Sequence, residues 1–455
     1  MGTARSVGIV SLGCPRNLVD SEAMLGLLRH HGFKIRDIEE GVDVAIVNTC
    51  SFIEDAKKES IDVILEASAL KKEGRIRYLV VAGCLPQRYA RELGKELPDV
   101  DCFIGTGDFV RLPEIIKTLN DTKRVVAVSP VPRGRYKTAG QRFPLTPAHF
   151  SYIKIAEGCA NRCSYCVIPQ IRGTLRSRTI GSVLDEVRRL TRTRGIRELN
   201  LIGQDTTLYG TDLYRRNALP ELMKRICRMD TGVEWVRLLY THPAHITREL
   251  IDVIAGEKKI CKYLDIPVQH INDRILKMMN RPTTRSRIER LIRDARKNIP
   301  DVALRTSVIV GFPGESDRDF AELLDFIGKT RFERLGAFIY SREEQTAAFA
   351  FKDQVPQKEK ERRFDEVMKV QQGLARQINK RLLTRELRVL VDERDGDILY
   401  GRTQWDAPEV DGSVTVRDGG MSVGEFYQVK VIDTLEYDLV ATRVKQEAAA
   451  KGTRR

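Results

Sequence analysis

The sequence predicts an α/β protein with an N-terminal parallel α/β domain, a central partial (β/α)6 TIM-like barrel and a small C-terminal all-β barrel. Short apolar runs alternate with helical segments along the first 340 residues, which is typical of βαβ units and a parallel sheet. A stretch rich in Pro, Gly and Arg interrupts this alternation after residue 122,. From residue 385 onward, short β-rich runs separated by Gly and Asp turns indicate a closed β-barrel,.

Three cysteines mark the predicted N-terminal domain, residues 1–122. Strands are expected at 7–12, 44–48, 78–82 and 102–104, with helices at 19–31, 52–70 and 87–97. Cys14, Cys50 and Cys84 each follow one of the first three strands. In an open α/β sheet the carboxyl ends of the strands share one edge, where ligands bind. We therefore expect these cysteines to meet, although about 35 residues separate each from the next.

Residues 123–147 are expected to be a linker, and residues 148–384 the partial barrel with a connector helix. Its six strands are expected at 152–156, 198–202, 233–239, 263–267, 303–310 and 335–339. Helical patterns such as 183–192 and 288–297 separate them, which favours six βα units rather than the complete eight. The charged segment 357–384 is expected to be a solvated helix. A β-barrel at 385–446 and a tail at 447–455 complete the chain.

Composition excludes a membrane protein, because the chain has no apolar run of about 18 residues,. The N-terminus lacks the features of a signal peptide and is expected to be the first strand. We expect a cytoplasmic protein, in which clustered cysteines favour a metal site over disulfides. The net charge is +14, yet residues 385–445 hold 8 Lys and Arg against 13 Asp and Glu. The basic body fits a nucleic-acid or ribosomal partner, or a basic surface without such a partner.

A second group of three cysteines lies in the run EGCANRCSYC, at Cys159, Cys163 and Cys166. An iron–sulfur cluster normally takes four thiolates, so three thiolates can hold three corners of a [4Fe–4S] cube and leave one iron open. The amino and carboxylate groups of S-adenosylmethionine can bind such an iron. A structural zinc site with a distant fourth ligand is the alternative, but the chain has no second Cys-x-x-Cys pair to complete it.

The cysteine segments resemble a known family over nearly the whole chain. EGCANRCSYCVIP resembles the cluster loop of radical S-adenosylmethionine enzymes, and SLGCPRNLVDSE, VNTCSF and VAGCLPQRY resemble the cysteine segments of their methylthiotransferase family. The resemblance implies two [4Fe–4S] clusters and a C-terminal TRAM domain. It implies that Cys159, Cys163 and Cys166 hold the catalytic cluster that cleaves S-adenosylmethionine. Cys14, Cys50 and Cys84 would hold an auxiliary cluster that carries the sulfur.

Cys102, Cys227 and Cys261 match no cluster position and are expected to be buried small hydrophobic residues. His242 and His270 are likewise expected in loops or the core rather than as ligands.

A cofactor pocket is expected at the strand ends of the central barrel. The glycines of IVGFPGE, which contains Gly311, Pro313 and Glu315, would let a ligand approach the backbone, although an ordinary strand-to-helix turn explains the motif equally well,. Gln204 follows another strand and could contact S-adenosylmethionine. Tyr165 could shield its adenine.

Arg172, Arg176 and Arg178 follow the cluster loop. They could steer an anionic substrate or cofactor, or they could lie on a solvated approach to a helix.

The family modifies either an adenosine of transfer RNA or an aspartate of ribosomal protein S-12. An acidic C-terminal barrel suits a basic protein partner better than a phosphate backbone. The segment GRTQWDAPEVDG resembles the aspartate-modifying branch, so Trp405, Asp406 and Glu409 are expected to bind the substrate. AEGCANRC departs from that branch without changing a ligand.

The predicted reaction is insertion of a methylthio group at the β-carbon of an aspartate of ribosomal protein S-12. Two S-adenosylmethionine molecules would supply the methyl group and the radical, and an electron donor and a sulfur source would be needed. No membrane partner is expected. The first alternative is a transfer-RNA adenosine 2-methylthiotransferase, and the second is an iron–sulfur or zinc scaffold without catalysis.

Overall fold

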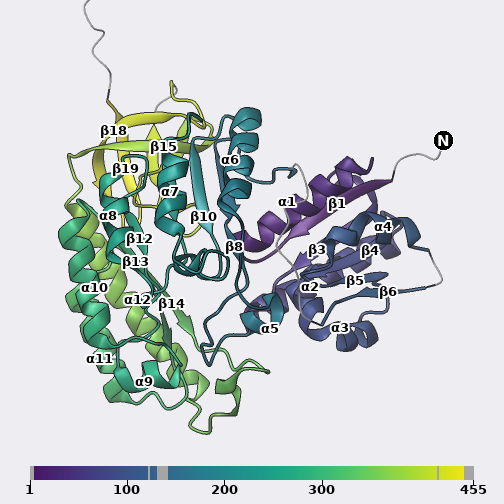
Figure 1. Cartoon of the computed structure of the whole chain (residues 1–455), viewed down its shortest axis with the longest axis horizontal. Coiled ribbons are helices and arrows are strands. Elements are labelled where there is room, and N and C mark those ends of the chain that lie inside the picture. The colour runs from purple at the N-terminus through teal and green to yellow at the C-terminus, as the bar shows by residue number, and fades with distance from the viewer. Residues whose placement is uncertain (1–4, 121–122, 131–141, 418–419, 445–455) are drawn as a thin grey trace, which may run out of the picture.

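The computed structural model describes residues 5–120, 123–130, 142–417 and 420–444. Its three bodies are an N-terminal sheet, a central barrel and a terminal β-barrel, which confirms the predicted fold class (Figure 1). The middle of the expected linker and the expected tail lie outside the described residues. No described helix is both long enough and apolar enough to cross a bilayer.

The N-terminal body is a six-stranded parallel sheet in the order β2-β1-β3-β4-β5-β6. Its strands are β1 (Ser6–Ser11), β2 (Lys34–Ile35), β3 (Val42–Thr49), β4 (Ile76–Gly83), β5 (Cys102–Ile104) and β6 (Val125–Ala127), and its helices are α1 (Pro15–His30), α2 (Glu54–Lys72), α3 (Cys84–Glu96) and α4 (Leu112–Thr118). Helices α1 and α4 cover one face and α2 and α3 the other. Strand β6 belongs to this sheet although it lies beyond the boundary predicted at residue 122.

The strand order reverses between β1 and β3, because the chain first moves outward to β2 and then crosses back. Ligands of doubly wound sheets bind in the crevice at such a reversal, outside the carboxyl ends of the strands. Cys14 follows β1 and Cys50 follows β3. The topology therefore puts the cysteines at the position where the sheet can accept a ligand.

The central body contains six parallel strands, as predicted. They form two three-stranded sheets, β7-β10-β11 and β12-β13-β14, which a bridge between Val236 and Ile260 connects. The strands are β7 (Phe150–Lys154), β10 (Glu198–Ile202), β11 (Trp235–Leu238), β12 (Tyr263–Asp265), β13 (Ala303–Val310) and β14 (Arg334–Ile339). The helices around them are α6 (Ile180–Arg194), α7 (Leu219–Cys227), α8 (Arg248–Gly256), α9 (Asp273–Met278), α10 (Arg285–Asn298) and α11 (Asp317–Thr330).

The helix α12 (Gln357–Lys380) differs from the solvated helix that its charged sequence predicts. Val367, Leu374 and Ala375 are buried on one of its faces, which packs against β14 and α11. Lys360 and Arg363 are buried as well, while most of the other charged residues are exposed. The helix therefore covers the edge strand β14 of the second central sheet instead of standing in solvent.

The terminal body is a closed barrel in the order β15-β16-β17-β19-β18. Its strands are β15 (Glu386–Asp395), β16 (Ile398–Arg402), β17 (Val414–Arg417), β18 (Phe426–Thr434) and β19 (Leu439–Arg443). The ten-residue β15 pairs with both β16 and β18 and thereby closes the barrel. Alternating residues such as Val389, Val391 and Leu399 point inward and fill it.

The terminal barrel docks on the amino ends of the central strands. The rings of Trp235, at the start of β11, and Phe426, at the start of β18, lie 4.7 Å apart. Arg237 is fully buried and donates to Glu198 at 2.8 Å and to the carbonyl of Gln404 at 2.7 Å. The interior of the central barrel is thus charged at this end, and the terminal barrel supplies the groups that pair with those charges.

The segment between β16 and β17 makes the densest of these contacts. Nε of Arg334, at the start of β14, donates to Asp406 at 2.9 Å, and the hydroxyl of Tyr263 donates to Asp411 at 2.6 Å. Asp406 is 2% exposed. Both acids of the terminal barrel therefore act as fixed partners for groups of the central barrel.

Asp406→Asn should weaken this docking, because it leaves the buried Arg334 without its anion. The loss of one partner of a buried pair costs about 3–5 kcal/mol. The two tryptophans of the chain, Trp235 and Trp405, both pack at this interface, so their fluorescence during urea unfolding measures the effect. The exposed Asp397→Asn is the control and should shift the transition by less than about 0.5 kcal/mol. Identical urea unfolding curves for the two variants would contradict the proposed role of the Asp406–Arg334 pair in docking.

Candidate functional site: two cysteine triads

The first triad lies at the carboxyl edge of the N-terminal sheet. Cys14 caps α1, Cys50 follows β3 and Cys84 begins α3, and all three thiols are free. Gly13 has φ of 82°, and a Cβ there would stand 2.9 Å from Sγ of Cys50. The loop after β1 is therefore pressed against the cysteine after β3, as the strand pattern predicts.

Two arginines place positive charge on this triad. Nε of Arg16 lies 3.5 Å from Sγ of Cys14, and the guanidinium of Arg172 lies 3.4 Å from Sγ of Cys84. Burial alone would raise the pKa of Cys14, but Arg16 and Arg172 lower it to about 7. Burial, with Cys84 and Cys14 nearby, raises the pKa of Cys50 to about 12. The surroundings favour thiolates only in part, and a bound cation would complete their deprotonation.

The second triad occupies the loop between the short strand β8 (Ala156–Glu157) and the helix α5 (Ile168–Arg172). Strand β9 (Arg176–Ser177) pairs with β8 and closes this loop at its base. Gly158 has φ of 77°, and a Cβ there would lie 2.1 Å from the carbonyl of Thr174, so the turn into the loop requires glycine,. Burial raises the pKa of Cys159 to about 11 and that of Cys166 to about 12.

The spacing of the thiols fits a cluster better than a single ion. In neither triad do the three Sγ atoms all lie within 4.8 Å of one another. A tetrahedral zinc site with Zn–S bonds of about 2.3 Å would bring them closer than that. A four-iron cube holds its thiolates farther apart, and three free thiols with no protein-supplied fourth fit such a cube with one open iron.

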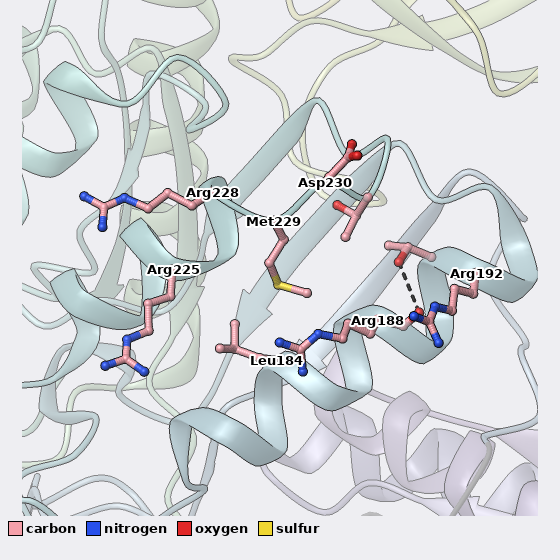
Figure 2. A pocket seen from close by; sticks show the side chains of 9 residues that line it. Leu184, Arg188, Arg192, Arg225, Arg228, Met229 and Asp230 are labelled. Carbon is pink, nitrogen blue, oxygen red and sulfur yellow. Dashed lines mark hydrogen bonds between the residues drawn. The ribbon is translucent and has the colours of Figure 1, made fainter.

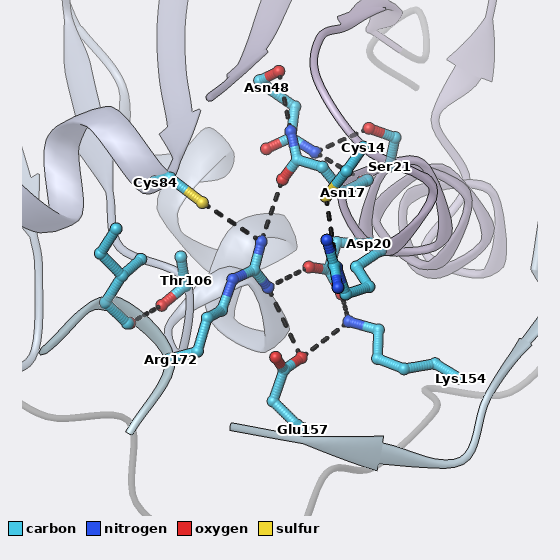
Figure 3. A network of polar contacts seen from close by, with 12 residues as sticks. Cys14, Asn17, Asp20, Ser21, Asn48, Cys84, Thr106, Lys154, Glu157 and Arg172 are labelled. Carbon is cyan, nitrogen blue, oxygen red and sulfur yellow. Dashed lines mark hydrogen bonds and ion pairs between the residues drawn. The ribbon is translucent and has the colours of Figure 1, made fainter. Parts of the chain in front are cut away.

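A buried network of ion pairs connects the first triad to the segments on either side of the loop that carries the second (Figure 3). Arg172, at the end of α5, pairs with Asp20 of α1 and lies 3.5 Å from Glu157. Lys154 pairs with the same two carboxylates, at 2.7 Å from Glu157. Gln204 donates to Glu157 at 2.6 Å. The two carboxylates come from different bodies, Asp20 from α1 and Glu157 from β8, so the network fixes the N-terminal body against the central barrel.

Arg16 provides a second bridge between the bodies. Besides Cys14 it contacts the carbonyl of Gly203 at 3.0 Å, directly after β10, and its guanidinium lies 4.2 Å from the ring centre of Tyr240. Its charge also acts on Cys166, where it opposes in part the rise in pKa that burial and Cys163 cause. One side chain therefore acts electrostatically on both triads.

The residues predicted to bind the cofactor lie on the edge that carries the second triad. Gln204 is held by Glu157, and its Oε1 is buried without a partner among the described residues. Tyr165 accepts a hydrogen bond from Arg281 at 3.2 Å and packs beside Phe312 and Tyr340. Both could contact a ligand beside the loop, and both stay predictions.

The turn at 309–315 owes its sequence mainly to packing. Gly311 has φ of 71°, and a Cβ there would collide with the side chain of Lys360 of α12 at 2.3 Å. Glu315 is 4% exposed and pairs with Arg363 of the same helix at 2.8 Å. Pro313 lies between them. These contacts support the ordinary strand-to-helix turn, and a cofactor role for the three residues stays untested.

The three arginines after the cluster loop are not on a solvated approach. Arg178 is buried and pairs with Glu186, and Arg172 belongs to the network described above. Arg176 is half-buried and donates to the carbonyl of Arg172 at 3.1 Å. Because Arg172 and Arg178 are buried and already paired with carboxylates, they are not available to attract an anion from solution.

The segment predicted to bind the protein substrate has a different role in the structure. Asp406 is the buried partner of Arg334, and Trp405 packs in the interface between the two barrels. Glu409 accepts from the hydroxyl of Tyr152 at 3.2 Å. Substrate binding by these residues stays a prediction, and the occupied carboxylate of Asp406 speaks against it.

The remaining cysteines and histidines are buried as expected. Cys102, Cys227 and Cys261 are at most 8% exposed, and His270 is fully buried. His242 is also buried, but at the carboxyl edge of the central sheet.

Sequence patterns did not reveal the charged residues of the bridging network. Lys154 lies between Ile153 and Ile155, where a charged residue is conspicuous. That anomaly was the available signal, since charged residues are rarely fully buried unless paired.

A basic pocket of about 680 Å³ lies away from both triads, on the outside of the central barrel between α6 and α7 (Figure 2). Arg188, Arg192, Arg225 and Arg228 line it. Arg188 and Arg225 pair with acidic neighbours on their own helices, Asp185 and Glu221. It contains none of the cysteines.

Comparisons with known families divide the chain as the three bodies do. Residues 6–105 match the model described as uncharacterized protein family UPF0004, residues 153–327 match the radical SAM superfamily, and residues 385–444 match the TRAM domain.

Curated relatives match nearly the whole chain. The ribosomal protein uS12 methylthiotransferase RimO of Geobacter sulfurreducens is 47% identical over 437 residues, which cover 95% of this chain and 97% of the relative. That of Clostridioides difficile is 43% identical over 436 residues, with coverage of 95% and 98%. Among solved structures, the radical S-adenosylmethionine methyltransferase TsrM of Kitasatospora setae matches with a TM-score of 0.56 at 17% identity, over 76% of this chain and 77% of that one. This structural likeness shows the fold.

Glu157 gives the bridging network a defined pH dependence. Burial alone would raise the pKa of Glu157, but Lys154 and Arg172 lower it to about 2, from 4.5. Because the folded-state pKa is the lower one, its stabilising effect is complete above about pH 4.5 and is lost as the pH falls toward 2. Urea unfolding of the metal-free protein between pH 6 and 3 should therefore show a decline that Glu157→Gln reduces. An unchanged pH slope in the variant would exclude this assignment.

Proposed function

The chain belongs to the family of ribosomal protein uS12 methylthiotransferases, and from this premise we propose that it attaches a methylthio group to the β-carbon of an aspartate of uS12, the protein named S-12 above. It is a radical SAM methylthiotransferase, as the matched superfamily and the full-length relatives indicate. The observation that carries the proposal is the pair of three-thiol sites, which the network around Arg172 joins across two bodies.

Each triad has its own task in this proposal. Cys159, Cys163 and Cys166 hold the cluster beside which S-adenosylmethionine binds, and Cys14, Cys50 and Cys84 hold the auxiliary cluster. When bound, the two [4Fe–4S] clusters and S-adenosylmethionine supply the electron, the carbon radical and the methylthio sulfur that no side chain can provide. A radical is required because no side-chain base removes a hydrogen as weakly acidic as that of the aspartate β-carbon.

The chain's own residues organise this chemistry. Arg16 and Arg172 place positive charge at Cys14 and Cys84, where thiolate ligands carry negative charge. The ion pair of Lys154 with Glu157 belongs to the network that holds the edges carrying the two triads in one relative arrangement. A transfer between separate sites requires such a fixed arrangement. Tyr165 and Gln204 are proposed to contact S-adenosylmethionine, and Gly311, Pro313 and Glu315 to shape the wall behind it.

We further propose three functional units: residues 1–130 for the auxiliary cluster, 142–384 for the radical reaction and 385–446 for docking. The first boundary includes β6, which pairs with β5. An electron donor and a sulfur source complete the system. A cytoplasmic location follows from the ribosomal substrate.

Iron content separates the two triads. After anaerobic reconstitution we expect about eight irons per chain, and about four in either Cys50→Ala or Cys163→Ala, because each site holds a four-iron cluster. Cys163→Ala should lose formation of 5′-deoxyadenosine. Cys50→Ala should keep it and lose methylthio transfer. Cys102→Ala, which removes a buried thiol outside both triads, serves as the control. Normal transfer by Cys50→Ala would refute the auxiliary site.

Mass spectrometry of a deletion strain tests the substrate. We expect uS12 to lose its methylthio group while the adenosines of transfer RNA keep theirs, and the gene in trans should restore the modification. The opposite pattern would establish the transfer-RNA alternative.

A further inference from the structure

A cluster of Asp205, His242 and His245 lies at the carboxyl edge of the central sheet, after β10 and β11. It adjoins the radical loop, because Asn161, between Cys159 and Cys163, donates to Asp205 at 2.7 Å. The imidazoles of the two histidines stack with ring centres 4.7 Å apart. The cluster therefore stands beside the site of radical formation.

The cluster resembles a metal site, since one ligand atom from each residue lies within 4.8 Å of the others. The hydrogen bonds of its three residues exclude a metal site. The carboxylate of Asp205 already accepts from Asn161, from Thr207 and from Nδ1 of His245, the last at 2.9 Å. Nδ1 of His242 accepts the backbone N–H of Ala244 at 3.2 Å, so the proton of the neutral ring is on Nε2,. An Nε2–H group has no lone pair for an ion.

Nε2 of His242 is a buried donor without an acceptor among the described residues, and the side chain is 6% exposed. Burial and the nearby positive charge of Arg281 lower the pKa of His242 to about 3, which keeps the ring neutral. Nε of Arg281 is likewise buried and without a described partner. Buried donors without acceptors are costly, and a bound water, ion or ligand can supply the missing acceptor.

Arg281 connects this donor pair to the radical loop. Its guanidinium donates to the hydroxyl of Tyr165 at 3.2 Å and lies 4.0 Å from Sγ of Cys163. A ligand that accepts from both orphan donors would be an anion with two acceptor oxygens, because one of the donors belongs to a cation. A carboxylate has this chemistry.

We propose that His242, together with Arg281, binds the side-chain carboxylate of the aspartate that is modified and so holds its β-carbon beside the radical loop. The inference rests on the proposed function. S-adenosylmethionine also has a carboxylate, but that group can bind the open iron of the radical cluster. The two donors then remain for the protein substrate and make His242 a specificity-determining residue.

The test compares two peptides of the modified uS12 loop, one with the target aspartate and one with asparagine in its place. Binding to the reconstituted enzyme is measured by fluorescence anisotropy. A carboxylate satisfies both donors and an amide only one, so wild type should prefer the aspartate peptide by about tenfold. His242→Phe should show a clearly smaller preference, because only Arg281 then distinguishes the carboxylate from the amide. His242→Gln should recover part of the preference, because its amide N–H can donate.

His31→Phe, which changes an exposed histidine at the end of α1, is the matched control and should keep the full preference. Iron content and melting temperature establish that each variant is folded and loaded. A preference that keeps its full wild-type value in His242→Phe would overturn the proposal. So would an unchanged preference combined with weaker binding of S-adenosylmethionine, since the donors would then serve the cofactor's carboxylate. Failure of wild type to bind either peptide would instead contradict the proposed function, before any variant is compared.

Discussion

The contact between Arg172 and Asp20 is the constraint on which the relation of the two triads depends. It joins the helix after the radical loop to the helix after Cys14, and its partners Lys154 and Glu157 extend it into the central sheet. Charges so deeply buried are costly unless each is matched, and here every charge has an opposite partner. Such a network has few alternative arrangements, so the two reactive edges share one geometry. Arg172 also lies 3.4 Å from Cys84, which couples this framework directly to a cluster ligand.

The interface between the central and terminal barrels changes what can be inferred from the acidic charge of the terminal barrel. Its excess of acids favours a basic protein partner when counted from the sequence. Asp406 and Asp411, however, pair with Arg334 and Arg305 of the central barrel. Part of the negative charge of the terminal barrel is therefore neutralised by arginines of the central barrel. The family membership supports uS12 as the substrate independently of that count.

The sequence was sufficient for the fold class and for the meeting of Cys14, Cys50 and Cys84, because strand periodicity and the shared edge of parallel strands are local and general rules. It was insufficient for β2 and β6, which are too short to show a periodic pattern. It was also insufficient for α12, because the many charged residues of this helix obscure the buried face in its sequence. The roles of Asp20 and Lys154 depend on a pairing 134 residues apart. No local pattern encodes such a pair. Asp406 illustrates the same limit, since a segment shared with relatives can be preserved by a domain contact as well as by a substrate.

The two triads also differ in how they come into being. The ligands of the radical loop lie within eight consecutive residues, so a short stretch of unfolded chain already contains a complete set. Cys14, Cys50 and Cys84 belong to three crossovers and become neighbours only after the parallel sheet has formed, which requires contacts of high sequence separation,. The first set therefore needs only a short loop, whereas the second set exists only once the sheet has folded. The auxiliary triad thus depends on the fold of the whole N-terminal body in a way that the radical loop does not.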